Sequence, residues 1–214
     1  MASERLTSHP ALLEALHKLD QKDHHLAEAR KRFGNPPDRF EPATFTSLMR
    51  IILGQQISRQ VAVVLWNRMC DREWIQADTV AGLRYDNLQM IGLSRRKAEY
   101  IIDLARAEVS GDLDLTTLNR KPAEVFHDTL ISHRGIGGWT ISNYRLFCLA
   151  DFNAWPGNDL ALMESVKRLK QLDSRPTPAE MDRFAESWQP YRGAAALMLW
   201  HLYSCLVRDG TPTG

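Results

Sequence analysis

Hydrophobic residues recur along the chain at the three- and four-residue spacing of one helix face. Within residues 9–34 the leucines that follow this spacing are Leu12, Leu13, Leu16 and Leu19. Such a pattern indicates an amphipathic helix with one buried face. Gly34, which two prolines follow closely, is a typical helix terminator. The pattern therefore predicts a helical segment that ends at Gly34.

The next stretch repeats this periodicity with an interruption. Residues 43–70 carry apolar positions on both sides of the polar segment 54–58, which predicts two helices joined by a loop. Two shorter helical pieces follow, and the segment after them opens with Ser94, a good N-cap, and closes at Gly111.

The remaining chain is also helical in pattern. Residues 122–150 predict a helix, a glycine turn and a second helix, and three further helices follow residue 159. No segment alternates at the two-residue period of a strand. The predicted fold class is all-α.

Length and composition add bounds. A chain of 214 residues with 44% hydrophobic content can bury a core in one domain or two joined lobes. The apolar runs are too short for a membrane span, and residues 1–10 lack a signal-peptide pattern, so we expect an intracellular protein without membrane contact. The three cysteines, Cys70, Cys148 and Cys205, are too far apart for a disulfide framework or a cysteine metal site.

Charge gives a local signal only. The net charge of +1 neither favours nor excludes a nucleic-acid partner. Arg95, Arg96 and Lys97 stand together after Gly92, either as a solvated helix start or as a small basic patch.

The glycine turn is the first candidate site. Gly135, Gly137 and Gly138 in "RGIGGWT" permit positive φ and close approach of another group. The following helix points its free N–H groups and positive dipole end at the turn, where a DNA phosphate can bind. A plain connection between two helices is the alternative.

The segment "LISHRGIGGWTISNYRLFCLADFNAWPGNDLAL" resembles the helix-hairpin-helix, Gly/Pro-rich loop and aspartate of the base-excision DNA glycosylase superfamily of that name. "FTSLMRIILGQQIS" and "ESWQPYRGAAALMLWHLYS" are similar to further segments of its alkyladenine branch, DNA-3-methyladenine glycosylase II, in its compact form. The resemblance implies two helical lobes with an active-site cleft between them. One lobe covers residues 45–150, and the other covers 1–44 plus 151–214.

Asp159 is the implied catalytic residue. Cleavage of an N-glycosidic bond develops positive charge at C1′, which a carboxylate stabilises, and the same acid can orient or deprotonate water. An alkylated purine leaves as a neutral base, so a general acid is not needed. From the residues alone, Asp159 is a natural N-cap, and Asp151 is the second candidate acid.

The resemblance also distinguishes the type of reaction. Bifunctional relatives place a nucleophilic lysine just after the hairpin glycines, where this chain has Trp139. We therefore expect a monofunctional enzyme that leaves an abasic site.

Base flipping requires a wedge and a pocket. The resemblance implies a wedge made of Gln55 and Gln56, with Gln56 aligned to the wedge residue itself; a polar loop between helices is the alternative. The implied base pocket consists of Trp139, Trp200, Trp155 and Asn143. Tryptophan faces suit a cationic purine, although any single tryptophan is more often part of a core.

The implied contacts to the DNA backbone are Gly135, Ile136, Gly137, Gly138 and Thr140. Backbone carbonyls of Ile131, His133 and Ile136 are expected to hold a sodium or potassium ion when DNA is bound, and no other cofactor is implied.

We expect a monomer that binds duplex DNA with alkylated or abasic nucleotides in the bacterial cytoplasm or a eukaryotic nucleus. Two alternatives stay open: a DNA-binding scaffold that recognises abasic or distorted DNA without excision, and an all-α interaction protein without a nucleic-acid role.

Overall fold

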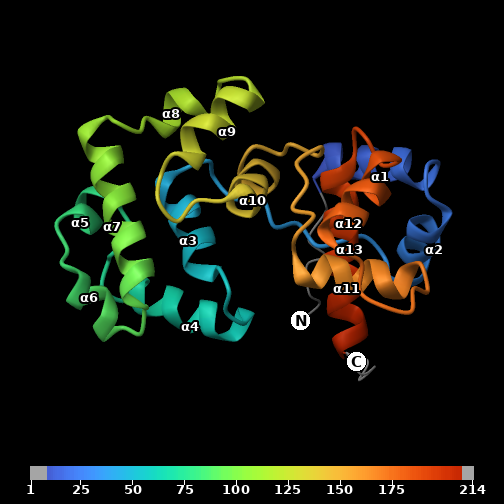
Figure 1. Ribbon diagram of the computed structural model, residues 1–214, viewed down its shortest axis with the longest axis horizontal. Coiled ribbons are helices and arrows are strands. Elements are labelled where there is room, and N and C mark those ends of the chain that lie inside the picture. Colours follow the sequence, from blue (N-terminus) through green and yellow to red (C-terminus); the bar gives the residue numbers. More distant parts are fainter. Residues whose placement is uncertain (1–8, 209–214) are drawn as a thin grey trace, which may run out of the picture. The chain divides into compact units, whose positions relative to one another are not determined.

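The computed structural model describes residues 9–208, with side chains through residue 206, and all regular elements of this part are helices (Figure 1). The all-α prediction is confirmed. The chain forms two compact units, one of residues 1–40 and 145–214 and the other of residues 41–144. Residues 1–8 and 209–214, which the predicted lobe bounds include, lie outside the described part.

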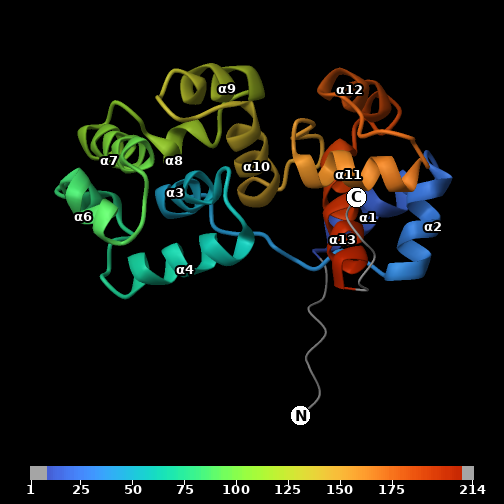
Figure 2. The ribbon, with the colours of Figure 1, turned by 60° about the horizontal axis from the view of Figure 1, so that its bottom comes forward.

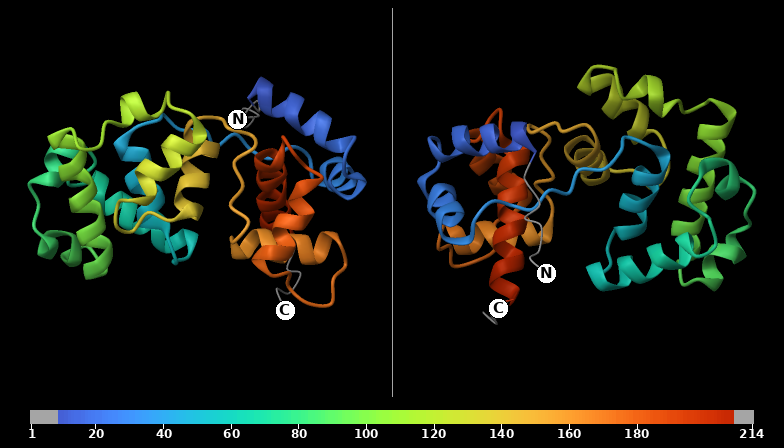
Figure 3. Two further views of the ribbon diagram at one scale, coloured as in Figure 1. Left: turned by 45° about the horizontal axis from the view of Figure 1, so that its top comes forward. Right: turned by 180° about the vertical axis from the view of Figure 1, so that it is seen from behind.

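The helices of the first unit come from both ends of the chain. They are α1 (Pro10–Asp20), α2 (His24–Phe33), α11 (Leu160–Leu169), α12 (Pro178–Glu186) and α13 (Arg192–Arg208). Helix α13 contacts α1, α2 and α11 (Figure 2). Both views of Figure 3 show the blue α1 and α2 beside the red α13. Joining distant segments of the chain in this way lets α13 supply the centre of a core.

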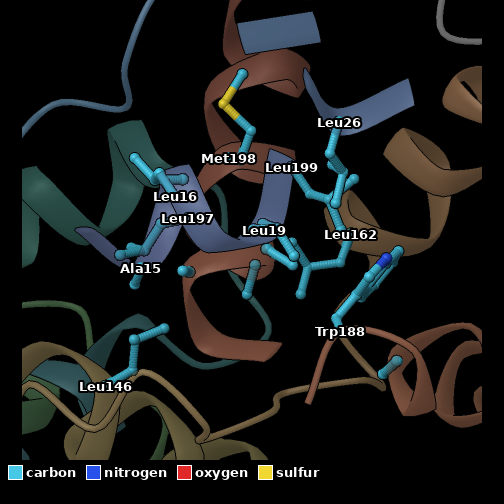
Figure 4. Close-up of a cluster of buried hydrophobic side chains, with 14 of the residues drawn as sticks. Ala15, Leu16, Leu19, Leu26, Leu146, Leu162, Trp188, Leu197, Met198 and Leu199 are labelled. Atoms are coloured by element: carbon cyan, nitrogen blue, oxygen red, sulfur yellow. The ribbon is translucent and has the colours of Figure 1, made fainter. Parts of the chain in front are cut away.

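The core of this unit is aliphatic and contains one fully buried tryptophan. Figure 4 shows six of its members from four helices and the loop after α12: Leu16, Leu19, Leu26, Leu162, Leu199 and Trp188. Each is 0–1% exposed. Burial of such side chains is the main source of folding free energy, and it fixes the start of α11, where Asp159 lies.

The predicted segment 9–34 is two helices, because Asp23 interrupts it. Asp23 has an extended backbone, and its Oδ1 accepts hydrogen bonds from the backbone N–H of His25 (3.0 Å) and Leu26 (3.3 Å). Its Oδ2 accepts from Lys170 Nζ at 2.7 Å and Trp188 Nε1 at 2.8 Å. This buried carboxylate therefore starts α2 and ties it to the segments after α11 and α12.

We expect Asp23→Ala to lower the free energy of unfolding by about 3 kcal/mol, because the half-buried Lys170 ammonium and the buried Trp188 N–H lose their acceptor. Burial raises the pKa of Asp23, but the hydrogen bonds from Lys170 and Trp188 outweigh it and leave the pKa below its usual value. The contribution of Asp23 to stability is thus complete above the pKa of an aspartate in the unfolded chain, about 3.9. It is lost as pH falls through the lower pKa of Asp23 in the folded protein. Urea unfolding at several pH values measures this contribution to stability. The control is Glu41→Ala, which breaks the exposed ion pair with Arg50. Equal losses of stability in the two variants would contradict the role of the buried Asp23 carboxylate.

The second unit begins with two helices joined by a polar loop. Its elements are α3 (Phe45–Gly54), α4 (Arg59–Cys70), α5 (Ala77–Ala81), α6 (Tyr85–Met90), α7 (Arg95–Ser110), α8 (Leu115–Leu118), α9 (Ala123–Ile131) and α10 (Gly138–Cys148), the last of which continues into the first unit. The predicted break at 54–58 is confirmed, as are the Ser94 cap and the stop at Gly111.

Helix α7 is central to the packing of this unit, since it contacts α3, α5 and α6 (Figure 1). Its buried face includes Ala98, Ile101, Ile102 and Ala105.

Within the described chain, no helix combines the length and hydropathy that a membrane span requires.

Candidate active site and hairpin

Asp159 is the N-cap of α11. Its backbone is extended, its N–H donates to the carbonyl of Pro156 (3.0 Å), and its carbonyl accepts from Met163. The carboxylate atom Oδ1 accepts from the backbone N–H of Ala161 at 2.9 Å and of Leu162 at 3.1 Å. The N-cap alternative is thus correct as a description of local structure. The cap also fixes the direction of a partly exposed carboxylate at the positive end of a helix.

Trp200 supplies a third donor to the same oxygen. Its Nε1 lies 3.1 Å from Asp159 Oδ1, and its ring stacks on Phe147 with a centroid separation of 5.5 Å. Two residues predicted for one site, 41 positions apart, are therefore brought together. Three donors on one oxygen hold the carboxyl group in a single orientation, which a group that must face a reacting carbon requires.

The loop before Asp159 explains its glycine. A Cβ on Gly157 would lie 2.3 Å from Trp155 Nε1 and 2.9 Å from Asp182 Oδ1. Those two groups hydrogen-bond each other at 3.0 Å, and Trp155 packs edge-to-face on the buried Trp188. Trp155 is thus attached to the core of its unit and holds the loop; its predicted contact with a base stays a prediction.

The glycine turn between α9 and α10 is shaped by Gly135. Its φ is +83°, and an added Cβ would lie 2.2 Å from the Tyr100 ring on α7. The backbone of the turn therefore rests directly on an aromatic ring. Ile136, the next residue, is buried. Only glycine satisfies both requirements at position 135.

Gly137 and Gly138 differ from Gly135. Both are exposed, neither has a positive φ, and an added Cβ at either would meet nothing within 4 Å. The packing of the chain itself therefore gives no reason for glycine at these positions. Because they open α10, whose first N–H groups have no intrahelical acceptor, an approaching anion has both space and donors here.

Gln55 is directed into the hairpin. Its Nε2 donates to the carbonyl of Gly135 at 3.0 Å and to Thr140 Oγ1 at 2.7 Å. Gln56 is exposed and has a φ of +56°. The wedge prediction for Gln55 is therefore revised, because its amide is engaged within the protein, whereas the prediction for Gln56 stays.

Thr140 and Asn143 lie on the buried side of α10. Thr140 is 1% exposed, so its hydroxyl serves Gln55 and does not point to solvent. Asn143 is 4% exposed and donates from Nδ2 to the carbonyl of Trp139 at 2.7 Å. Both polar groups thus fix the helix internally, while Trp139, half-buried at its second position, is the more accessible of the predicted pocket residues here.

The end of α9 fits the predicted cation site in its donor type. Ile131 ends the helix, where carbonyls have no intrahelical donor. The carbonyl of His133 accepts from the N–H of Ile136 at 3.2 Å and keeps a second lone pair. Burial lowers the pKa of the His133 imidazole, against the opposing charge of Asp112.

Three residues around the hairpin were not predicted from sequence. Tyr100 supports Gly135, and Arg134 lies over the Tyr100 ring at 5.7 Å. Lys97 donates from Nζ to the carbonyls of Leu53 (2.9 Å) and Gln55 (2.7 Å). The basic run 95–97 was the available signal, but it does not separate the half-buried lysine from its two exposed arginine neighbours.

Comparison with known proteins gives a family match. The family model described as "HhH-GPD superfamily base excision DNA repair protein" matches residues 49–190, which include the 54–58 loop, the hairpin and Asp159.

Individual relatives are similar over most of the described chain. The Bacillus subtilis protein YfjP, whose name as a DNA-3-methyladenine glycosylase is itself provisional, is 34% identical over 74% of this chain and 58% of its own length. A DNA-3-methyladenine glycosylase of the same species is 31% identical over 75% and 57%. The chain thus spans less than three fifths of these relatives.

A solved structure shows the same fold. It is the Schizosaccharomyces pombe 3-methyladenine DNA glycosylase in complex with abasic DNA, with a TM-score of 0.82 and 23% identity over 91% of this chain and 97% of that chain. At this identity the likeness concerns the fold.

Proposed function

The chain belongs to the HhH-GPD superfamily of base excision DNA repair proteins, and on this premise we propose that it is a monofunctional DNA glycosylase. Its substrates are alkylated purines of the 3-methyladenine and 7-methylguanine type in duplex DNA. Its product is an abasic site. The observation that carries the proposal is the carboxylate of Asp159, which Ala161, Leu162 and Trp200 hold in one orientation at the end of the Gly/Pro loop.

The reaction requires one negative charge. As the C1′–N bond breaks, its electron pair goes to the cationic purine, which leaves neutral, and positive charge develops on the sugar. The Asp159 carboxylate stabilises that charge. Water then bonds to C1′, and its proton passes to Asp159 or to solvent. Alkylated purines fit this scheme because their departure needs no general acid.

Lyase chemistry is not part of the proposal. An amine at the position after the hairpin glycines is needed for attack on C1′, and Trp139 is there. The ammonium group of Lys97 is engaged elsewhere, since its Nζ donates to the carbonyls of Leu53 and Gln55. We therefore propose that the abasic strand is released intact.

DNA is held by the hairpin in this proposal. The exposed Gly137 and Gly138 let a phosphate approach the N–H groups that open α10. The carbonyls of Ile131, His133 and Ile136 would hold a sodium or potassium ion there, which adds positive charge beside the phosphate. Gln56 would fill the space left by the flipped nucleotide, and Trp139 and Trp200 would stack on the base. We propose a monomer that acts inside the cell, on nucleoid or nuclear DNA.

The proposal is tested by base release. Duplex DNA that carries 3-methyladenine, 7-methylguanine, hypoxanthine or ethenoadenine is incubated with the protein, and free bases are measured by mass spectrometry. Release of the two methylated bases with an intact abasic strand is expected. Binding to abasic DNA without release of any base would instead identify a scaffold, and absence of salt-dependent DNA binding would contradict any nucleic-acid role.

Trp200→Phe tests the third donor to Asp159. Phenylalanine keeps an aromatic ring against Phe147 but removes the N–H that lies 3.1 Å from Asp159 Oδ1. We expect single-turnover base release to slow by about tenfold, since the carboxylate loses one of its fixing hydrogen bonds. Trp74→Phe in the other unit is the matched control. An unchanged rate in Trp200→Phe would show that the hydrogen bond has no part in catalysis.

A further inference from the structure

The side chain of Gln55 attaches the loop at 54–58 to the hairpin, and Lys97 binds the backbone at the end of α3, while Gln56 stays exposed. Gln55 reaches across from the end of α3 to Gly135 and Thr140, which are 80 and 85 residues later in the chain. Lys97 on α7 donates to two carbonyls, that of Leu53 in the last turn of α3 and that of Gln55 in the loop. Gln55 is therefore fixed at both its side chain and its carbonyl.

Lys97 is buried in part without an ion partner among the described residues. Its ammonium group is half-buried, and no carboxylate in the described part of the chain lies within ion-pair distance. Burial without an ion partner lowers its pKa and costs stability. The benefit is local, because a cation at the C-terminal end of α3 binds the carbonyls that the helix leaves without donors and opposes the helix dipole.

The position of Thr140 gives Gln55 a second link to the phosphate-binding end of α10. Thr140 is in the first turn of α10, 1% exposed, and its hydroxyl accepts from Gln55 at 2.7 Å. The carbonyl of Gly135, the other acceptor, belongs to the residue of the turn that has a positive φ and lies against Tyr100. A displacement of the turn therefore moves the two acceptors of Gln55 together.

From this arrangement we infer that Gln55 and Lys97 are positioning residues that hold the Gln56 tip and the hairpin as one rigid part. A phosphate at the start of α10 then fixes the place at which Gln56 enters the duplex. Gln55 acts through Gln56 and does not itself contact a base. This inference rests on the proposed function, because it assumes that Gln56 enters damaged DNA.

A double-mutant cycle tests the inference. Affinity for a duplex with a tetrahydrofuran abasic site, for the intact duplex and for the single strand is measured by fluorescence anisotropy for Gln55→Ala, Gln56→Ala and the double variant. We expect each single variant to weaken binding to the abasic duplex by about tenfold, with single-strand affinity unchanged. The double variant should bind like Gln56→Ala alone, since Gln55 acts through the same tip. Gln60→Ala, exposed on α4, is the control and should bind like the wild type.

Two outcomes overturn the inference. If the losses multiply in the double variant, or if a folded Gln55→Ala binds like the wild type, Gln55 does not act through Gln56. A wild type without preference for abasic over intact duplex would instead refute the proposed function, and that result is read independently of the variants.

Thr140 provides a second test that does not depend on the stability of Gln55→Ala. Thr140→Val removes the acceptor of Gln55 at nearly constant volume, while Thr140→Ser keeps it. We expect Thr140→Val to lose affinity for the abasic duplex as Gln55→Ala does and Thr140→Ser to retain it. Equal affinity of the two Thr140 variants would overturn the link to α10.

Discussion

Asp159→Asn is expected to slow base release by about 100- to 1000-fold, the usual loss when one group that stabilises transition-state charge is removed. Asparagine is as good an N-cap as aspartate, and its Oδ1 can still accept from Ala161, Leu162 and Trp200. The substitution thus removes charge and little else. Thermal unfolding should be nearly unchanged, and binding to abasic duplex should persist.

The control for this prediction is Asp151→Asn, because Asp151 is the other acid near the loop. Its carboxylate pairs with Arg145 and accepts from the N–H of Asn153, so its loss should affect stability and leave the rate of the folded protein close to wild type. Most activity retained in Asp159→Asn, with activity lost in Asp151→Asn, would reassign the catalytic acid.

Gly138→Leu is expected to weaken binding to any duplex by about 10- to 100-fold, because a side chain placed over the first N–H groups of α10 blocks a charge-assisted contact with a phosphate. The protein should fold normally, since an added Cβ at Gly138 meets nothing within 4 Å and no positive φ is required. Affinity as a function of salt concentration measures the effect, and the slope should decrease by about one phosphate contact.

Val125→Leu provides the comparison for Gly138→Leu. Val125 is exposed on α9, so added bulk there should leave DNA binding intact. If Gly138→Leu binds DNA like Val125→Leu, the hairpin glycines have no role in binding a backbone, and the plain helix connection is the better interpretation.

Periodicity predicted the helices well where burial determines the pattern. The segments on either side of 54–58 and the stretch from Ser94 to Gly111 behave as expected, because their apolar faces form the core and their caps are local. The break at Asp23 was missed, since leucine spacing continues on both sides of it. An aspartate before two histidines is a visible cap signal, but its acceptor role with Lys170 depends on tertiary contact.

The site was predictable only in part. The resemblance placed Asp159 and Trp200 in one site, whereas it did not distinguish Gln55 from its neighbour Gln56. What separates these two glutamines is a pair of hydrogen bonds from Gln55 to residues 80 and 85 positions later. A single sequence carries no local signal for such contacts. The same holds for Trp155, whose partner Asp182 lies on α12.

The central claim is that the Asp159 carboxylate stabilises positive charge on the sugar, and the most direct test compares two abasic duplexes. One carries a neutral tetrahydrofuran and the other a cationic pyrrolidine, whose charge mimics the sugar in the transition state. We predict that the wild type binds the cationic duplex more tightly and that Asp159→Asn binds both equally. Equal binding by the wild type, or a preference that survives in Asp159→Asn, would contradict the claim.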